Sequence, residues 1–317
     1  MVADPVWRHT VEHVWFNSGG LRCAGELYRP ERSSYPHACV VMAHGFSGTS
    51  DWIVPDFAAR FADGGLTTLV FDYRYLGRSQ GEPRQLIDGR RQREDLRRAV
   101  EFMRGNGGID PHCIALWGTS LGGSHVINIA ADDPEIAAVV ANVPALEVFK
   151  GTRGRSEPVG FHPTRRQVAL ASIRLIGAAS WDAIRGAVGL SPYYIPVYGP
   201  LGRAVFADPA VAPLFEALEE GAPLWRNRVT PRFLFTAPRY RDGTIARIAA
   251  PLMVTVARDD ATLSTGFVKR KATEAHRVEI TEYPVGHFDM YHGEVRDQVA
   301  TDHLDFLRRH LARRRSK

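Results

Sequence analysis

Hydrophobic and polar positions along the chain form two kinds of pattern that follow one another. Eight short segments are rich in apolar and β-branched residues, as strands are, at residues 9–16, 21–28, 38–43, 67–71, 114–117, 136–142, 252–257 and 277–283. Helical patterns occupy residues 54–63, 88–104, 120–132, 264–275 and 294–314. Strands that alternate with helices predict βαβ units and a mainly parallel sheet. The turn Asn17-Ser18-Gly19-Gly20 between the first two strands predicts that an antiparallel hairpin precedes this sheet.

The alternation stops between residues 149 and 248. This stretch mixes helical patterns with proline-rich and aromatic runs, such as residues 191–200, and has no clear succession of strands. It lies between two predicted strands of the sheet, so we predict an inserted, mostly helical cap over the carboxyl edge of the sheet, where α/β proteins bind ligands. Residues 1–148 and 249–317 would then form the α/β core.

Length and charge narrow the classes of function. A chain of 317 residues fits one large α/β domain with an insertion. Its 40 basic and 35 acidic residues give a net charge of +5, with clusters at residues 90–98 and 308–317. Neither cluster has interleaved aromatic residues or a binding motif, which favours solvated helix faces. We therefore predict no nucleic-acid and no membrane partner.

The cysteines indicate the redox state of the cellular compartment in which the protein lies. Cys23, Cys39 and Cys113 all fall in strand-like segments, and an odd number there indicates buried thiols in a reducing compartment. No apolar run is long enough to span a bilayer, and no secretory signal is visible. These observations predict a cytoplasmic protein. No Cys or His spacing resembles a zinc site, so no metal is expected.

The stretch Gly118-Thr119-Ser120-Leu121-Gly122 carries the strongest chemical signal. It joins a predicted strand to a predicted helix, the setting of a nucleophile elbow, in which a sharp turn exposes the serine hydroxyl. The stretch Gly77-Arg78-Ser79-Gln80-Gly81 has the same spacing, but Pro83 and a polar run follow it, which indicates a loop. Ser120 is therefore the predicted nucleophile, and the chain is predicted to be a serine hydrolase.

A serine hydroxyl needs a base within hydrogen-bond reach. In proteins with such an elbow the chain order is serine, then acid, then histidine. His287 follows the last predicted strand in a glycine-containing loop, which makes it the predicted base. His125 lies on the helix just beyond the elbow and would point away, while His292 and His303 fall in or near the last helix.

The base in turn needs an orienting carboxylate. Asp259 and Asp260 both follow the strand at residues 252–257, next to the predicted histidine loop. We favour Asp260 as the acid and keep Asp259 as the alternative. The one that is not the acid is expected to cap the turn or the next helix. Asp289 is too close in sequence to His287 to hold it easily.

The oxyanion of the intermediate needs two hydrogen-bond donors. One is the backbone N–H of Leu121, which follows the nucleophile. The second is the backbone N–H of Phe46, because Gly45 after the strand at 38–43 permits the tight backbone that aims it. We expect His44 to fix this loop through a hydrogen bond.

Together these segments resemble the α/β-hydrolase superfamily. The matching segments are His44-Gly45-Phe46, the loop at 72–79, Gly118-Thr119-Ser120-Leu121-Gly122-Gly123, Ala257-Arg258-Asp259-Asp260 and Gly286-His287-Phe288. The resemblance covers residues 20–290 apart from the cap. It implies the α/β-hydrolase fold and makes Asp260 the matching acid, although Ala257 stands where the family commonly has glycine. The histidine loop and the cap are loosely similar to dienelactone-hydrolase-like and polyketide-transferase-like members.

The predicted cap contributes aromatic residues that would build its own core or line a pocket. They are Phe161, Trp181, Tyr193, Tyr194, Tyr198, Phe206, Phe215, Trp225, Phe233, Phe235 and Tyr240. We therefore predict a small-molecule substrate, a fairly bulky hydrophobic ester or lactone, cleaved without a cofactor. An acyltransferase with the same triad and a non-catalytic binding protein on this fold are the alternatives. Whether the chain forms a homodimer is left open.

Overall fold

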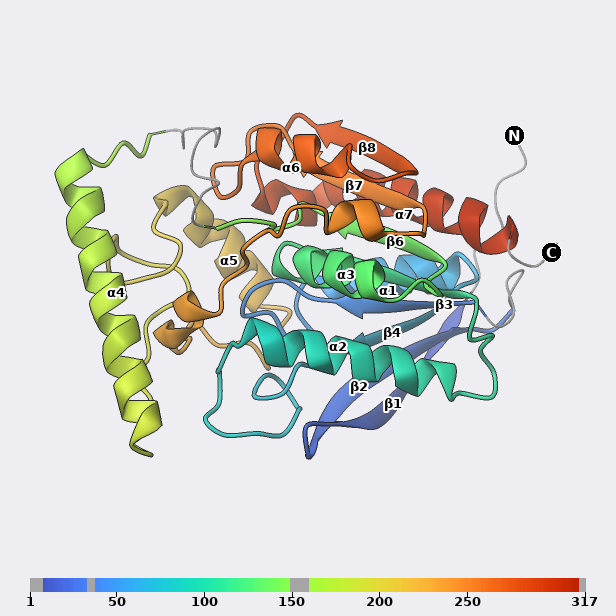
Figure 1. The fold of residues 1–317 in the computed structure, drawn as a ribbon, viewed down its shortest axis with the longest axis horizontal. Coiled ribbons are helices and arrows are strands. Elements are labelled where there is room, and N and C mark those ends of the chain that lie inside the picture. Colours follow the sequence, from blue (N-terminus) through green and yellow to red (C-terminus); the bar gives the residue numbers. More distant parts are fainter. Residues whose placement is uncertain (1–7, 33–37, 149–159, 314–317) are drawn as a thin grey trace.

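A computed structural model describes residues 8–32, 38–148 and 160–313 of the chain. The described strands form an eight-stranded sheet in the order β1-β2-β4-β3-β5-β6-β7-β8 (Figure 1). They are β1 (His9–Ser18), β2 (Leu21–Pro30), β3 (Cys39–Ala43), β4 (Thr67–Phe71), β5 (Ile114–Thr119), β6 (Ala138–Asn142), β7 (Leu252–Ala257) and β8 (Val278–Tyr283). All eight predicted strands are confirmed.

Helices connect the strands and cover the sheet. The α-helices are α1 (Val54–Asp63), α2 (Gly89–Arg104), α3 (Leu121–Asp132), α4 (Arg165–Ala187), α5 (Ala212–Glu219), α6 (Thr265–Ala272) and α7 (Gly293–Arg313). The 3₁₀ turns are η1 (Pro209–Val211), η2 (Pro231–Phe235), η3 (Ile245–Arg247) and η4 (Phe288–Tyr291). The five helices expected in the core are therefore confirmed as α1, α2, α3, α6 and α7.

The sheet is mixed in the way the sequence predicts. Strands β1 and β2 pair antiparallel over their full length, and β2 pairs antiparallel with β4. The pairs β3–β4, β3–β5, β5–β6, β6–β7 and β7–β8 are all parallel. The tight turn between β1 and β2 uses Gly19 and Gly20 at positive φ, which glycine adopts without steric cost. The carboxyl ends of the parallel strands consequently lie along one edge, where the chemistry is expected.

Two apolar layers bury the sheet. Successive side chains of a strand point to opposite faces, so Leu116 and Trp117 of β5 belong to different clusters. The Trp117 face packs against α1 and α7, and the Leu116 face packs against α2, α3 and α6 (Figure 1). Because both faces are covered, the central strands are almost entirely buried.

Residues 160–248, here named the cap segment, pack at the carboxyl edge of the sheet (Figure 1). The cap segment is held partly through Trp52 of the core, whose ring lies 5.5 Å from that of Phe215 and 5.6 Å from that of Trp225. Residues 149–159 of the predicted cap lie outside the described residues. The division into core and inserted cap domain stays a prediction.

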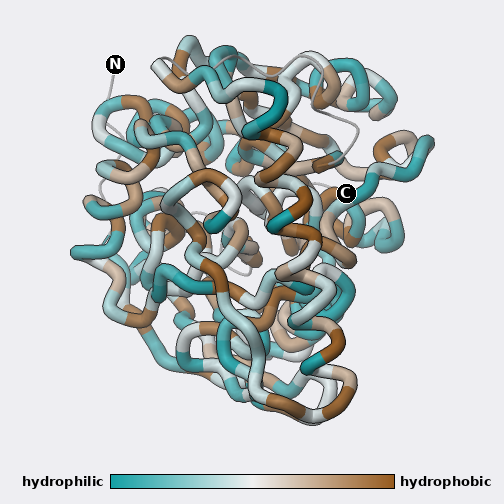
Figure 2. Tube along the Cα trace, turned by 90° about the vertical axis from the view of Figure 1, so that its left-hand side faces the viewer, coloured by the Kyte–Doolittle hydropathy of each residue, from teal (hydrophilic) through white to brown (hydrophobic). Residues whose placement is uncertain are grey.

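Helix α4 has an apolar side that the rest of the described chain leaves uncovered. Only Ala171, Ala179 and Asp182 of α4 are fully buried, whereas Ile173, Trp181 and several other large side chains are exposed. Figure 2 views the molecule from the side on which α4 lies and shows hydrophobic and hydrophilic positions interspersed along the trace. None of the helices in the described part of the chain has the length and apolar character needed to span a bilayer.

Candidate active site

Ser120 occupies a strained turn between β5 and α3. Its φ of 52° and ψ of −115° lie in a region that residues with a side chain rarely adopt. The turn is held by hydrogen bonds from the Ser120 N–H to the Asn142 carbonyl (2.9 Å) and from the Ala145 N–H to the Ser120 carbonyl (2.8 Å). The side chain makes no capping hydrogen bond to α3, although serine commonly does so at a helix start. The hydroxyl is therefore left for chemistry.

The glycines of the motif are required by backbone packing. A Cβ on Gly118 would overlap the carbonyl oxygen of Gly122. A Cβ on Gly122 would overlap the carbonyl oxygen of Ala43 and lie 2.6 Å from that of His44. The strand, the turn and the helix can come this close only where both side chains are missing. This packing accounts for the spacing that identified the elbow.

His287 and Asp260 form a buried pair at the carboxyl edge. The imidazole Nδ1 lies 2.8 Å from Asp260 Oδ2, and both side chains are only 3% exposed. The other carboxylate oxygen, Oδ1, accepts hydrogen bonds of 2.7 Å from the N–H groups of Thr262 and Leu263. Because an ionised carboxylate only accepts, Nδ1 carries the proton and leaves Nε2 as the acceptor. This is the arrangement that a histidine base requires.

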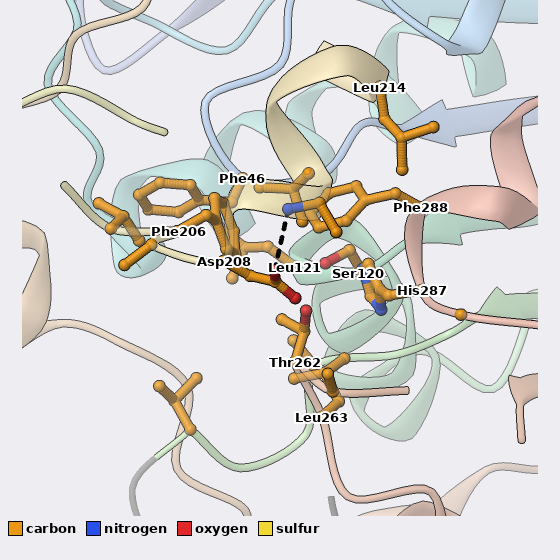
Figure 3. Close-up of a pocket in the computed structure, with 18 of the residues that line it drawn as sticks. Phe46, Ser120, Leu121, Phe206, Asp208, Leu214, Thr262, Leu263, His287 and Phe288 are labelled. Atoms are coloured by element: carbon orange, nitrogen blue, oxygen red, sulfur yellow. Dashed lines mark hydrogen bonds between the residues drawn. The ribbon is translucent and has the colours of Figure 1, made fainter. Parts of the chain in front are cut away.

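Ser120 and His287 line the same cavity, and Figure 3 shows the serine hydroxyl next to the imidazole. Among the described residues no hydrogen bond joins the two side chains. Such bonds are often long in ligand-free sites and tighten when substrate is bound. The structure thus brings the three predicted triad residues to one place, while their catalytic roles stay a prediction.

The competing candidates have other partners. Asp259 is exposed and pairs with Arg258 at 3.3 Å. The Asp289 carboxylate accepts a 2.9 Å hydrogen bond from the Gly286 N–H and so fixes the histidine loop. The Ser79 hydroxyl is buried in its own loop, where it accepts from the Ala24 N–H.

The remaining histidine candidates are also accounted for. His125 is fully buried, and its Nε2 lies 3.1 Å from Gln92 Oε1. His303 is fully buried between Trp117 and Thr255. Burial lowers the pKa of each of these two imidazoles to about 3, which keeps both rings neutral. His292 ends η4 beside α7 and does not line the cavity.

The two expected oxyanion donors lie beside Ser120. A Cβ built on Gly45 would come within 3.4 Å of Ser120 Cβ, so the loop after β3 lies against Ser120. Leu121 is the first residue of α3, where backbone N–H groups have no partner within the helix. Within the described residues, the N–H groups of Phe46 and Leu121 donate to no protein group. Both donors are thus left for a ligand oxygen.

His44 supports this loop as expected. Its Nδ1 lies 3.0 Å from the Gly45 carbonyl oxygen, and the ring packs against Tyr73. Complete burial lowers the pKa of His44 to about 4, so the ring is neutral near pH 7 and donates this hydrogen bond through Nδ1–H.

The cavity has a volume of about 880 Å³, and most of its lining is apolar. Of the cap aromatics, Phe161, Phe206 and Phe233 line it, and Phe206 and Phe233 also contact the ring of Phe46. Others build the packing of the cap segment itself, as Phe215 and Trp225 do. A cavity of this size and character accepts a bulky hydrophobic ligand.

Sequence reasoning missed a buried polar network behind the elbow. Asn142 donates to Thr119 Oγ1 (3.2 Å) and accepts from Thr255 Oγ1 (2.7 Å), and the Thr119 hydroxyl also meets Tyr291 (2.7 Å). The network ties β5, β6 and β7 together where Ser120 leaves the sheet. The available signal was a polar residue at or near the carboxyl end of each of these otherwise apolar strands.

Comparison with known proteins places the chain among hydrolases. The sequence model of a family described as serine aminopeptidase, S33, matches residues 34–169. The chain is 36% identical over 298 residues to the quorum-quenching protein AidA of Acinetobacter baumannii, which covers 93% of this chain and 94% of that protein. It is 29% identical over 317 residues to the polyketide transferase grgF of a Penicillium species, with 98% and 100% covered. The crystal structure of the α/β hydrolase GrgF superposes with a TM-score of 0.76 at 26% identity and covers 96% of this chain and 99% of that one.

Proposed function

Because the chain belongs to the α/β-hydrolase superfamily and is a hydrolase, we propose that it cleaves a carboxylic ester or lactone of a bulky hydrophobic substrate. The observation that carries this proposal is the buried His287–Asp260 pair, which shares one apolar cavity with the uncapped hydroxyl of Ser120. A binding protein on this fold would not need a strained serine next to a correctly polarised imidazole.

In the proposed mechanism Ser120 attacks the acyl carbon while His287 Nε2 removes the hydroxyl proton. Asp260 holds the imidazole in the required tautomer and stabilises its positive charge. The N–H groups of Phe46 and Leu121 bind the oxyanion of the tetrahedral intermediate. These hydrogen bonds stabilise the transition state more than the ground state and so lower the activation barrier. His287 then gives its proton to the leaving alcohol, and an acyl-Ser120 intermediate remains.

Release of the acyl group decides between two activities. Water deprotonated by His287 would give the acid, whereas another alcohol or an amine in the same position would give acyl transfer. We retain acyl transfer as the alternative activity because the relative grgF, which matches this chain over almost its whole length, is named a polyketide transferase. Product analysis with an added acceptor alcohol distinguishes the two activities, since transfer yields a new ester in place of the free acid.

The test begins with covalent labelling. A fluorophosphonate probe should modify Ser120, as located by peptide mass spectrometry, because the reagent reacts with an activated serine. Ser120→Ala should abolish labelling and lower turnover on p-nitrophenyl esters or lactones by about 10⁴–10⁶-fold without changing the unfolding midpoint. Labelling of Ser79, or equal activity of Ser120→Ala, would refute the proposal.

The two neighbouring carboxylates provide a matched control. Asp260→Asn should reduce kcat by about 10⁴-fold, because the amide favours the wrong imidazole tautomer. Asp259→Asn makes the same chemical change at the preceding residue, which is exposed and pairs with Arg258, and should have little effect on kcat. The reverse result would assign Asp259 as the acid.

Location and assembly remain predictions. All three cysteines are described and buried, and no disulfide joins them, which supports the proposed cytoplasmic location. The exposed apolar side of α4 is the surface on which a homodimer, if it forms, would be sought first.

A further inference from the structure

A carboxylate of the cap segment enters the cavity that Ser120 lines. Asp208 is half-buried and lines the same cavity as Ser120 and His287. Figure 3 shows its side chain directed into the cavity, toward Thr262. Apolar residues such as Phe206 and Leu214 form the wall from which it projects. A carboxylate in such a wall is a polar group that can fix the orientation of a ligand in an otherwise apolar cavity.

One oxygen of this carboxylate holds the local fold. Oδ1 accepts a 2.9 Å hydrogen bond from the Ala210 N–H at the start of η1. Within the described residues Oδ2 has neither a hydrogen bond nor an ion pair. Asp259, which also lines the cavity, differs because it pairs with Arg258. Asp289 likewise accepts from one N–H, that of Gly286, but it is exposed, whereas Asp208 is half-buried in the apolar wall.

We propose that Asp208 is a specificity-determining residue that accepts a hydrogen bond from the substrate, so that the substrate carries a hydroxyl or ammonium donor away from its reacting carbonyl. This inference rests on the proposed function, since it assumes that the acyl carbon lies at Ser120. The carbonyl and the donor would then be held at two different places in the cavity, one by the core and the other by the cap segment. A carboxylate-bearing substrate would be rejected by charge repulsion.

If Asp208 only capped the η1 turn, other capping residues could replace it. Asparagine and serine also cap helical turns. Asp208→Asn is nearly isosteric, and its oxygen can keep the hydrogen bond with the Ala210 N–H. Its NH₂ group then replaces Oδ2, so a substrate ammonium loses its acceptor and a substrate hydroxyl can bind only as an acceptor, without the charge-assisted hydrogen bond. The substitution therefore preserves the cap and removes the proposed recognition.

The experiment measures kcat/KM for ethyl esters of equal chain length that carry no substituent, one hydroxyl or one amino group. For the wild type we expect the donor-bearing ester to be favoured. In Asp208→Asn and Asp208→Ser the ratio of donor-bearing to unsubstituted ester should fall about 10–100-fold. Preference for the hydroxyl ester would identify a neutral donor, and preference for the amino ester alone would identify a cation.

The matched control is Glu216→Gln, which makes the same change of charge on an exposed residue of α5 that does not line the cavity. Its substrate ratio should equal that of the wild type. An unchanged ratio in both Asp208 variants, or an equal loss on all esters, would overturn the inference while leaving the proposed function intact. If the folded wild type cleaved no ester or lactone and Ser120 was not labelled, the proposed function itself would fail.

Discussion

At the scale of single residues, Gly122 shows how little room the nucleophile turn has. A Cβ there would meet the backbone carbonyls of Ala43 and His44, which cannot swing aside as a flexible side chain can. We expect Gly122→Ala to lower the free energy of unfolding by about 3 kcal/mol or more, measured by urea unfolding. The same shift would displace the Leu121 N–H and reduce esterase activity.

Gly177 is the matched control for this substitution. It lies in the exposed part of α4, and a Cβ there would meet nothing within 4 Å. Gly177→Ala should therefore raise stability by about 1 kcal/mol through helix propensity alone. Equal urea midpoints for the two alanine variants would show that the elbow is not packed as the structure has it.

Residue spacing also explains what could be predicted about the site. Chain order and the elbow motif pointed to Ser120 and His287, which the structure brings to one cavity. Asp259 and Asp260 are adjacent, so spacing alone could only rank them, and the structure distinguishes them by the 2.8 Å contact between His287 and Asp260. Asp208 could not be predicted, because only the folded cap segment brings it to the cavity that Ser120 lines.

At the scale of elements, one buried ion pair attaches α4 to η2. The Asp182 side chain is completely buried and binds Arg232 through Nε (2.6 Å) and Nη2 (2.9 Å). It also accepts from the Tyr193 N–H. Asp182→Ala would leave a partly buried guanidinium without its partner, so we expect a loss of about 2–4 kcal/mol and faster amide hydrogen exchange in α4.

An exposed pair provides the comparison. Asp242 pairs with Lys271 at 2.8 Å, but its side chain is 89% exposed. Asp242→Ala should change stability by less than about 1 kcal/mol, since water screens such pairs. If Asp182→Ala were equally mild, the ion pair would not be what holds α4.

Element prediction succeeded where burial follows a regular pattern. The core helices bury one face, and the central strands are short continuous apolar runs because both of their faces are covered, so the eight predicted strands agree with the structure. Helix α4 carries apolar residues on both its packed and its exposed sides, for example Leu175 and Ile173. Its hydrophobic pattern therefore shows no single face, and the sequence could predict a helical cap without placing its elements.

At the scale of the whole molecule, buried titratable groups predict acid sensitivity. Burial lowers the pKa of His44 to about 4 and the pKa values of His125 and His303 to about 3, all from 6.5. Between pH 6.5 and about 4 the unfolded chain binds protons at these rings and the folded protein does not. Stability therefore falls as the pH falls through this range. Burial raises the pKa of Asp72 from 3.8 to about 6, which acts in the opposite direction.

Each titrating group changes the free energy of unfolding by about 1.4 kcal/mol per pH unit. The three imidazoles outnumber the two buried carboxyl groups whose pKa is raised, Asp72 and Asp95, so stability should fall between pH 5.5 and 4.5, as measured by urea unfolding at each pH. His303→Gln offers an amide to Trp117 and Thr255 but cannot titrate, so its stability should fall less steeply, by about 1.4 kcal/mol per unit less than the wild type. Equal slopes for the two proteins would show that His303 is not buried as a neutral ring. A rise in stability toward pH 4.5 would instead mean that Asp72 and Asp95, and not the histidines, dominate the response of the folded protein to acid.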